Sequence, residues 1–232
     1  MIYEIRQNLN PKGHPAVNVR GKETADETRE RIAQVAEELF RRMGFAKTAV
    51  ADIAAELGMS PANVYRFFPS KTAIVEAICQ KCLTESEVEV AQAATGPGTP
   101  QDRIVAAYAS ILAYHKANFL AERRVHDMVQ VAIEHNWQNI EAHKARIAAM
   151  VAGVLAEGME SGTFVPHVPA QVSAILLGAC VRFCHPVLIA QNIDEDLEGQ
   201  LDATVRFILR AVEAERAPLA APARTAPARK GG

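Results

Sequence analysis

The sequence has little excess charge, few aromatic residues and no long apolar run. Its 25 lysine and arginine residues face 27 acidic residues, which leaves a formal net charge of -2. A strongly basic chain is therefore excluded, and any contact with nucleic acid has to come from a local patch. No apolar stretch approaches the roughly 18 residues that a membrane span needs. The first residues lack an apolar core followed by a small-residue cleavage site, so we expect no secretory signal.

What the chain does contain indicates a folded cytoplasmic protein. Apolar residues make up 49% of the sequence, which is enough to build a sizeable core. Four cysteines in a chain of this length, without a secretory signal, favour free thiols in a reducing compartment. We therefore expect a soluble, globular, cytoplasmic protein.

The apolar pattern is helical almost everywhere, and strand signals are missing, so the sequence predicts an all-α fold of about nine helices. Residues 1–23 resemble a flexible basic arm, and residues 216–232 form an Ala/Pro/Arg-rich tail that cannot bury enough apolar surface to order itself. Between them we expect a small domain over 24–75 and a larger one over 76–215.

Capping and stop signals place the helices. In the small domain, the first helix ends before Gly44, a short one ends at Gly58, and Ser60 opens a third. A fourth runs from Ser70 to about Ala94. The later helices are expected at 101–117, 121–134, 137–160, 169–190 and 195–214, with a kink in the fourth of these at Pro186.

Two short helices meeting at a tight turn indicate a helix-turn-helix. Gly58 permits the left-handed backbone of a sharp turn, and Ser60 starts the next helix. Ile53, Leu57 and Val64 can fill the space between the two helices. In such a unit the second helix enters the major groove of DNA and its N-terminal half reaches the base edges.

The residues around this turn closely resemble the TetR family of bacterial regulators over about 28–78. The match rests on residues spaced as in that family: Thr48, Asp52, Ile53, Ala54, Gly58, Ser60, Tyr65, Phe68 and Lys71. The resemblance implies an N-terminal three-helix DNA-binding domain and a larger C-terminal helical domain for effector binding and dimerisation. It also implies a dimeric transcriptional regulator, a repressor released from its operator by a small molecule.

The same resemblance assigns DNA contacts. Thr48, Tyr65 and Lys71 match positions that hold phosphates. Ala62, Asn63 and Arg66 match the base-reading part of the recognition helix, which Ser60 opens, so we include all four among the DNA-binding residues. Pro61, Ala62 and Asn63 replace the lysine or arginine, glycine and threonine of many relatives, so the operator sequence cannot be carried over. An alternative for Tyr65 is that it only covers the helix-turn-helix core.

The last two long helices are expected to pair two subunits. Small residues (Ala174, Gly178, Ala179) punctuate the helix over 169–190, and apolar residues repeat at three- and four-residue steps in 195–214. Two such helices from each subunit would form a four-helix interface, and two-fold pairing fits a palindromic DNA site. The alternative is that these stripes face their own core.

The effector is expected to be small and apolar or amphipathic, because such pockets are mostly apolar with a few polar anchors. Arg182 on an apolar helix needs a partner, either a ligand or an acidic residue of the protein. The stretch Phe183-Cys184-His185-Pro186 resembles the AefR-like branch of the family. The candidate effector residues are Tyr108, Leu112, His115, Met128, Trp137, Arg182 and His185, with core packing as the alternative for Trp137.

Four cysteines raise the alternative of a thiol or metal sensor. Cys79 and Cys82 lie in one predicted helix, and Cys180 and Cys184 lie one turn apart in another. Both pairs fall on apolar stripes, where cysteine usually serves as a small buried hydrophobe, so we expect no metal and no cofactor. Phosphate-loop, nucleophile-elbow and zinc-protease motifs are missing, so we do not expect an enzyme. A helical enzyme or an adaptor that does not bind DNA remains the rival class.

Overall fold

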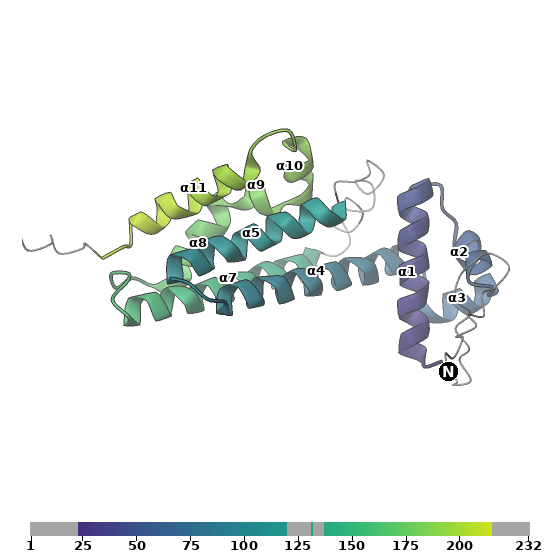
Figure 1. Cartoon of the computed structure of the whole chain (residues 1–232). Helices are drawn as coiled ribbons and strands as arrows, with labels where there is room; N and C mark the ends of the chain where they lie inside the picture. Colours follow the sequence, from purple (N-terminus) through teal and green to yellow (C-terminus); the bar gives the residue numbers. More distant parts are fainter. Residues whose placement is uncertain (1–22, 120–130, 132–136, 215–232) are drawn as a thin grey trace, which may run out of the picture. The chain divides into compact units, whose positions relative to one another are not determined.

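The computed structural model describes residues 23–119, 131 and 137–214. Every regular element in these ranges is a helix, and the only strand-like pairing there is an isolated bridge between Phe164 and Glu213 (Figure 1). The all-α prediction is confirmed. The helices are α1 (Ala25–Met43), α2 (Val50–Glu56), α3 (Pro61–Phe67), α4 (Lys71–Thr95), α5 (Pro100–Phe119), α7 (Trp137–Glu160), α8 (Pro169–Ala179), α9 (Val181–Cys184), α10 (Pro186–Gln191) and α11 (Leu197–Arg210).

Two compact units divide the chain, and α4 contributes to both. The first unit contains α1, α2, α3 and α4 as far as Cys82. The second begins at Leu83 and contains the rest of α4, α5, α7 from Ile140 onward, and α8 to α11. This division falls inside a continuous helix, and the domain boundary expected after residue 75 stays a prediction.

The long helix α1 is fixed at both ends by its own sequence. The Thr24 hydroxyl accepts a hydrogen bond from the Glu27 amide at 3.2 Å, and the Glu27 carboxylate accepts one from the Thr24 amide at 2.8 Å. This reciprocal pair satisfies two amides that the helix itself leaves open. At the other end Gly44 adopts φ 92°, a conformation that side chains disfavour, and the helix stops.

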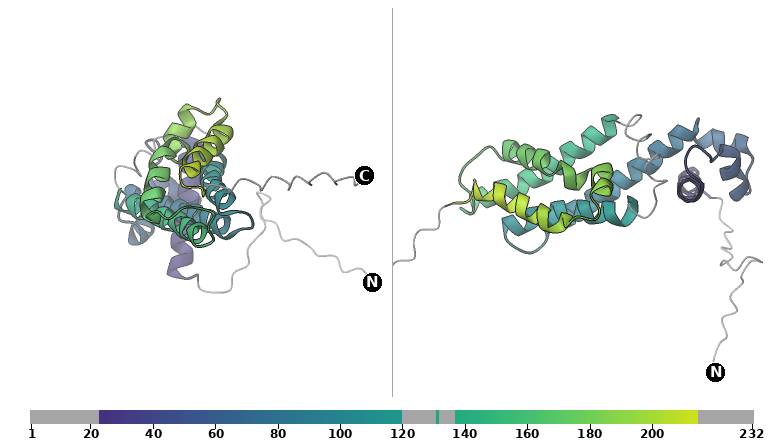
Figure 2. Two further views of the ribbon diagram at one scale, coloured as in Figure 1. Left: turned by 90° about the vertical axis from the view of Figure 1, so that its left-hand side faces the viewer. Right: turned by 90° about the horizontal axis from the view of Figure 1, so that it is seen from above.

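The core of the second unit lies between α5 and the C-terminal helices. Figures 1 and 2 show α5 and α11 side by side, and α9 and α10 also contact α5. Leu155 and Phe164 are buried in this core beside the chain turn that follows α7. The ring of Phe164 occupies the place where a side chain at Gly158 would begin, so only glycine fits there. The Phe164 ring therefore packs directly against the backbone of Gly158 at one end of the core.

The prediction of a single helix at 169–190 is wrong, because this stretch is interrupted twice in the structure. Cys180 separates α8 from α9, and His185, which has φ -96° and ψ 119°, separates α9 from α10. Pro186 explains the second break, since it lacks an amide and forces the residue before it toward extended backbone. The kink predicted at this proline is therefore a complete interruption of the helix.

The other expected helices agree with the structure to within a few residues. The range 137–160 coincides with α7, and the helices expected at 101–117 and 195–214 correspond to α5 and α11. The helix expected at 121–134 lies outside the described residues, except for position 131. None of the described helices combines the length and the apolar character that crossing a bilayer requires.

Candidate DNA interface and effector site

The turn between α2 and α3 has the geometry that its sequence predicts. Asp52 accepts a hydrogen bond from the Ala49 amide at 2.7 Å, which fixes the start of α2. Gly58 adopts φ 66°, and the Met59 amide donates to the Ala54 carbonyl at 2.8 Å across the turn. The Ser60 hydroxyl then accepts from the Asn63 amide at 3.2 Å and caps α3. These short-range bonds set the angle between the two helices.

A small apolar core holds α2 and α3 against each other. Ile53, Ala54 and Val64 have no solvent-exposed surface, and Phe68 closes the core after the end of α3. Leu57, which was expected to fill the same space, is half-buried. Close packing of this kind makes the pair of helices a rigid unit.

The outer face of α3 presents the predicted base-reading residues. Ala62 and Arg66 are exposed, and Asn63 is half-buried. The Arg66 guanidinium donates to the Asn63 side-chain oxygen at 3.3 Å, so the two polar side chains lie side by side on this face. Tyr65 keeps 50% of its surface exposed, which favours an outward role over simple cover for the core.

Two predicted phosphate contacts are engaged within the protein. Thr48 is buried, and its hydroxyl donates to the Gly44 carbonyl at 2.9 Å. The Lys71 ammonium donates to the carbonyls of Phe45 at 2.7 Å and Thr48 at 2.9 Å, and burial lowers the pKa of this lysine. Any phosphate at either side chain has to compete with these internal bonds.

In the second unit, three effector candidates line one face of α5. Tyr108, Leu112 and His115 follow each other at steps of four and three, and α9 and α10 pack against this helix. Tyr108 and Leu112 are buried, and His115 is half-buried with its Nδ1 atom shielded from solvent. Residues spaced in this way share a face of a helix, so these three candidates lie together on α5, and their role in effector binding stays a prediction.

Two polar atoms of the second unit are buried without a hydrogen-bond partner among the described residues: the Tyr108 hydroxyl on α5 and the Nδ1 atom of His185, which lies between α9 and α10. Burial, together with the nearby thiols of Cys180 and Cys184, raises the pKa of Tyr108. Burial lowers the pKa of His185, and it lowers the pKa of His115 to about 4. These three side chains are therefore uncharged near neutral pH, and no described residue uses the hydrogen-bonding capacity of the Tyr108 hydroxyl and the His185 Nδ1 atom.

Arg182 lies in the ion pair that the sequence left open as an alternative. Its guanidinium contacts the Glu195 carboxylate at 2.6 Å and donates to the side-chain oxygens of Asn192 at 2.9 Å and Gln200 at 3.2 Å. The side chain is 38% exposed. With its donors used in this way, Arg182 resembles a brace between α9 and α11 more than a ligand anchor.

The remaining effector candidates cannot be placed with the three candidates on α5. Met128 lies outside the described residues, and Trp137 is described only as the first residue of α7.

The thiols lack the surroundings of a sensor. Burial raises the pKa of Cys180 to about 12, and it raises the pKa of Cys184 as well, so both stay protonated and unreactive. Cys79 and Cys82 are half-buried in α4. Within the described ranges, no three histidine, cysteine or acidic side chains converge in a way that could hold a metal ion.

Sequence reasoning missed an ionic network between α4 and α7, in which Glu87 and His143 are largely shielded from solvent and Arg146 is exposed. Glu87 accepts from His143 at 2.8 Å and from two nitrogens of Arg146, both at 2.8 Å. Burial opposes ionisation of Glu87, yet these bonds keep its pKa below the usual value. The partners lie 56 and 59 positions apart, so no local pattern marks them.

Comparison with known proteins gives matches in both units. Residues 32–78 match the model of bacterial regulatory proteins of the tetR family, and residues 100–205 match a tetracyclin repressor-like C-terminal domain. The regulator TtgR of Pseudomonas putida is 41% identical over 59 residues. That segment is 25% of this chain and only 28% of TtgR.

Solved structures share the fold over most of the chain. A TetR/AcrR-family regulator from Thermobifida fusca superposes with a TM-score of 0.56 at 24% identity, covering 79% of this chain and 97% of that one. The fatty acid degradation regulator FadR of Bacillus halodurans gives a TM-score of 0.61 at 14% identity, covering 81% and 96%. The described helix-turn-helix and the two family models agree: the chain belongs to the TetR family of DNA-binding transcriptional regulators and is not an enzyme.

Proposed function

We propose that this regulator is a cytoplasmic homodimeric repressor that leaves a palindromic operator when a small amphipathic effector binds its second unit. The observation that carries the proposal is the buried Tyr108 hydroxyl, which, like the His185 Nδ1 atom, finds no partner among the described residues. Leaving a buried polar group unsatisfied costs about 1–3 kcal/mol, and a bound molecule that supplies the missing hydrogen bonds would remove this cost.

The surroundings of Tyr108 suggest the character of the effector. Leu112 and Phe183 belong to the same buried core, and the neighbouring thiols behave as apolar groups. An apolar body with one or two oxygen atoms, such as an alcohol, ketone or ester, matches this combination. A ligand of this kind changes operator affinity only if it binds the DNA-free conformation better than the DNA-bound one.

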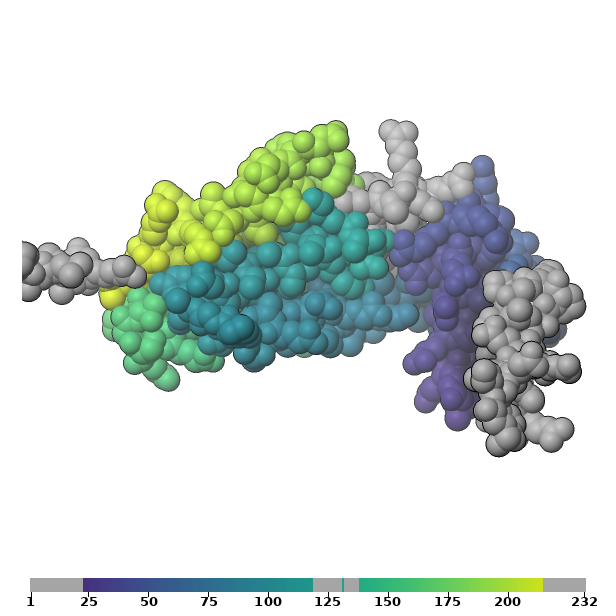
Figure 3. Space-filling model, in the orientation of Figure 1, coloured from purple at the N-terminus to yellow at the C-terminus, as the bar shows by residue number. Residues whose placement is uncertain are grey.

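An exposed apolar face supports pairing through α8 and α11. Ile175 is 60% exposed and Phe207 is 76% exposed, and small residues lie beside them on the same two helices. Figure 3 shows α11 at the surface of the second unit. Large apolar side chains are rarely displayed together on a protein that stays monomeric, so a second copy of the chain is the occupant that we propose.

At the DNA we propose base contacts from Ala62, Asn63 and Arg66, and phosphate contacts from Ser60 and Tyr65. Asparagine suits adenine and arginine suits guanine, because each can make two hydrogen bonds to one base edge. A duplex selected from a random library by the purified protein would give the operator. Replacement of Arg66 by alanine should weaken binding by about 1–3 kcal/mol and relax selectivity at one base pair of each half-site.

A direct test combines this duplex with extracts of the natural host. Native mass spectrometry of the protein purified from such cells should reveal a bound small molecule, and adding that molecule should release the duplex. Failure to select any sequence would reject the DNA-binding part of the proposal. Selection followed by no release with any bound or extracted compound would reject the effector part alone.

A further inference from the structure

Two cations of the first unit, the exposed Arg29 and the half-buried Lys71, donate hydrogen bonds to backbone carbonyls. Lys71, the first residue of α4, donates to Phe45 and Thr48, which lie in the loop before α2. Its ammonium also lies over the Phe45 ring, 4.1 Å from the ring centre. An ammonium has three donors, and the carbonyls use two of them while the ring covers the charge.

Arg29 of α1 makes the corresponding contact at the other end of the helix-turn-helix. Its guanidinium donates to the Phe67 carbonyl at 2.7 Å and lies 4.6 Å from the centre of the Phe68 ring. Phe67 is the last residue of α3, and the final carbonyls of a helix have no partner within the helix. A cation there also complements the negative end of the helix dipole.

The two contacts share one design. Each cation comes from a long helix, lies against an aromatic ring, and binds a carbonyl at one end of the α2–α3 segment. Hydrogen bonds from charged donors are stronger than those between neutral groups, so these bonds resist displacement of the segment. Partial burial disfavours the charged form of Lys71 and lowers its pKa.

We infer that Lys71 and Arg29 are positioning residues that hold α2 and α3 in the orientation for DNA, and that Lys71 forms no ion pair with a phosphate. This inference rests on the proposed operator binding, and for Lys71 it replaces the phosphate role that the family resemblance implied. Asn63 and Arg66 then owe their placement to two cations that never touch the DNA.

The salt dependence of binding separates the two roles of Lys71. Each phosphate ion pair contributes about 0.9 to the slope of log affinity against log salt concentration on double-stranded DNA. The probe is the duplex selected by the wild-type protein. For Lys71→Met we expect binding about tenfold weaker at every salt concentration, with a slope equal to that of the wild type. Arg29→Met should give a second parallel line.

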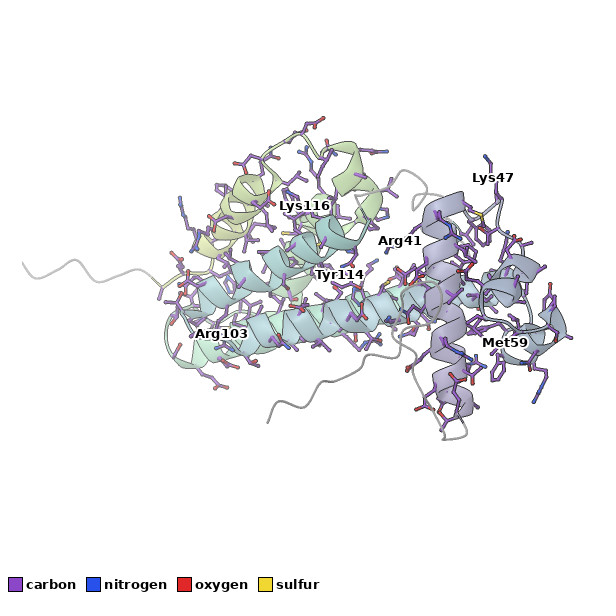
Figure 4. All side chains as sticks on the ribbon, turned by 45° about the vertical axis from the view of Figure 1, so that its right-hand side comes forward. Arg41, Lys47, Met59, Arg103, Tyr114 and Lys116 are labelled. Carbon is purple, nitrogen blue, oxygen red and sulfur yellow. The ribbon has the colours of Figure 1, made fainter. Side chains whose placement is uncertain are left out.

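Lys47 supplies a matched control. It is exposed in the loop between α1 and α2 and extends away from the helices (Figure 4). Lys47→Met removes the same charge from the same region without releasing a carbonyl, so its thermal unfolding midpoint should equal that of the wild type. The midpoints of Lys71→Met and Arg29→Met should fall.

Two results would overturn the inference: a slope that drops by about 0.9 in Lys71→Met, or unchanged affinity in a folded Lys71→Met protein. If Lys71→Met does not fold, Phe45→Leu removes only the ring beneath the ammonium and should also weaken binding without changing the slope. If the wild type selects no duplex, the proposed function fails on its own. In that case, the free energies of unfolding in urea test the contact between the Lys71 ammonium and the Phe45 ring. Coupling between the effects of Phe45→Leu and Lys71→Met supports this contact, and strict additivity rejects it.

Discussion

In the described part of the first unit, open backbone groups are satisfied by nearby caps and by two cations that are more distant in sequence, whereas some buried polar atoms of the second unit have no partner among the described residues. In the first, the caps of α1, α2 and α3 and the cations Arg29 and Lys71 occupy the open backbone groups. In the second, the Tyr108 hydroxyl and the His185 ring lie buried without a partner among the described residues. A DNA-binding domain needs a single fixed shape, whereas a ligand-binding domain needs hydrogen-bonding groups that are available to the ligand. This contrast fits the proposal that the first unit recognises DNA and the second unit responds to an effector.

The largest expected effect concerns pairing, which we propose for α8 and α11 of the second unit. Ile175→Glu combined with Phe207→Glu puts charges on the exposed apolar face of α8 and α11. Burying unpaired charge in an interface costs about 3–5 kcal/mol, so we expect monomers and at least about a hundredfold loss of operator affinity. Analytical ultracentrifugation and a DNA titration measure both. Val88→Glu, at another exposed apolar residue of the second unit, serves as a control, and dimers that persist in the double variant would contradict the assignment.

The next effect is a pH dependence of stability that arises from buried histidines of the second unit. Burial lowers the pKa of His115 to about 4, from 6.5 in the unfolded chain. Above pH 6.5, His115 is neutral in both the folded and the unfolded chain, so it does not reduce the free energy of unfolding. Between pH 6.5 and 4, His115 binds a proton only in the unfolded chain. Acidification to pH 5 should therefore reduce the free energy of unfolding by about 2 kcal/mol, measured with urea.

The variant His115→Gln should flatten this pH dependence. Burial also lowers the pKa values of His143 and His185, so these residues contribute in the same direction and some slope should remain. A wild-type protein whose stability is constant from pH 7.5 to 5 would contradict the burial of these rings.

A pair of glycines tests whether turn geometry governs the first unit as proposed. Gly58 has φ 66° and Gly153 lies inside α7, and neither has an atom within 4 Å of an added Cβ. An added Cβ thus has enough room at both positions, and the two glycines differ in their backbone conformation. Gly58→Ala should destabilise by about 1–2 kcal/mol, whereas Gly153→Ala should stabilise by about 0.5–1 kcal/mol. Thermal unfolding reports both, and equal signs would show that the left-handed turn is unimportant.

The smallest expected effect is a difference in stability between two variants that each lose one tyrosine hydroxyl. Tyr108→Phe removes a buried hydroxyl that has no described partner, so the stability of the ligand-free protein should stay unchanged or rise by about 1 kcal/mol. Tyr114→Phe removes a hydroxyl that donates to Glu85 at 2.8 Å, and it should cost about 0.5–1 kcal/mol. Release of DNA by the effector should weaken only in Tyr108→Phe. A clear loss of stability in that variant would mean that its hydroxyl is satisfied without a ligand.

The sequence predicts most of the first unit because its signals are local. Ser60, Gly58 and Gly44 act within a few residues of where they stand, through caps and left-handed turns. The exposed positions of Ala62 and Arg66 follow directly from the periodicity of α3. The internal bonds of Lys71 and Thr48 could not be foreseen, because their carbonyl partners are identified only when the loop before α2 has a shape.

The second unit resists prediction because its determinants are distant in sequence. Glu87 meets His143 and Arg146 across more than 50 positions, and Arg182 finds Glu195 only after the chain reverses. The break at Cys180 follows Gly178, but a glycine within an apolar helical pattern does not by itself predict a helix end. Pro186 is visible in the sequence, but only the packing around it shows that α9 and α10 are separate helices.

The internal use of Arg29 and Lys71 has a consequence for how the protein searches a genome. Between Arg20 and Gln80 there are nine basic and nine acidic residues, and two of these nine cations are committed to carbonyls. Attraction to phosphates irrespective of sequence is then weak, and residence on unrelated DNA is brief. We therefore expect operator binding to depend on the specific contacts of α3 rather than on general attraction to DNA.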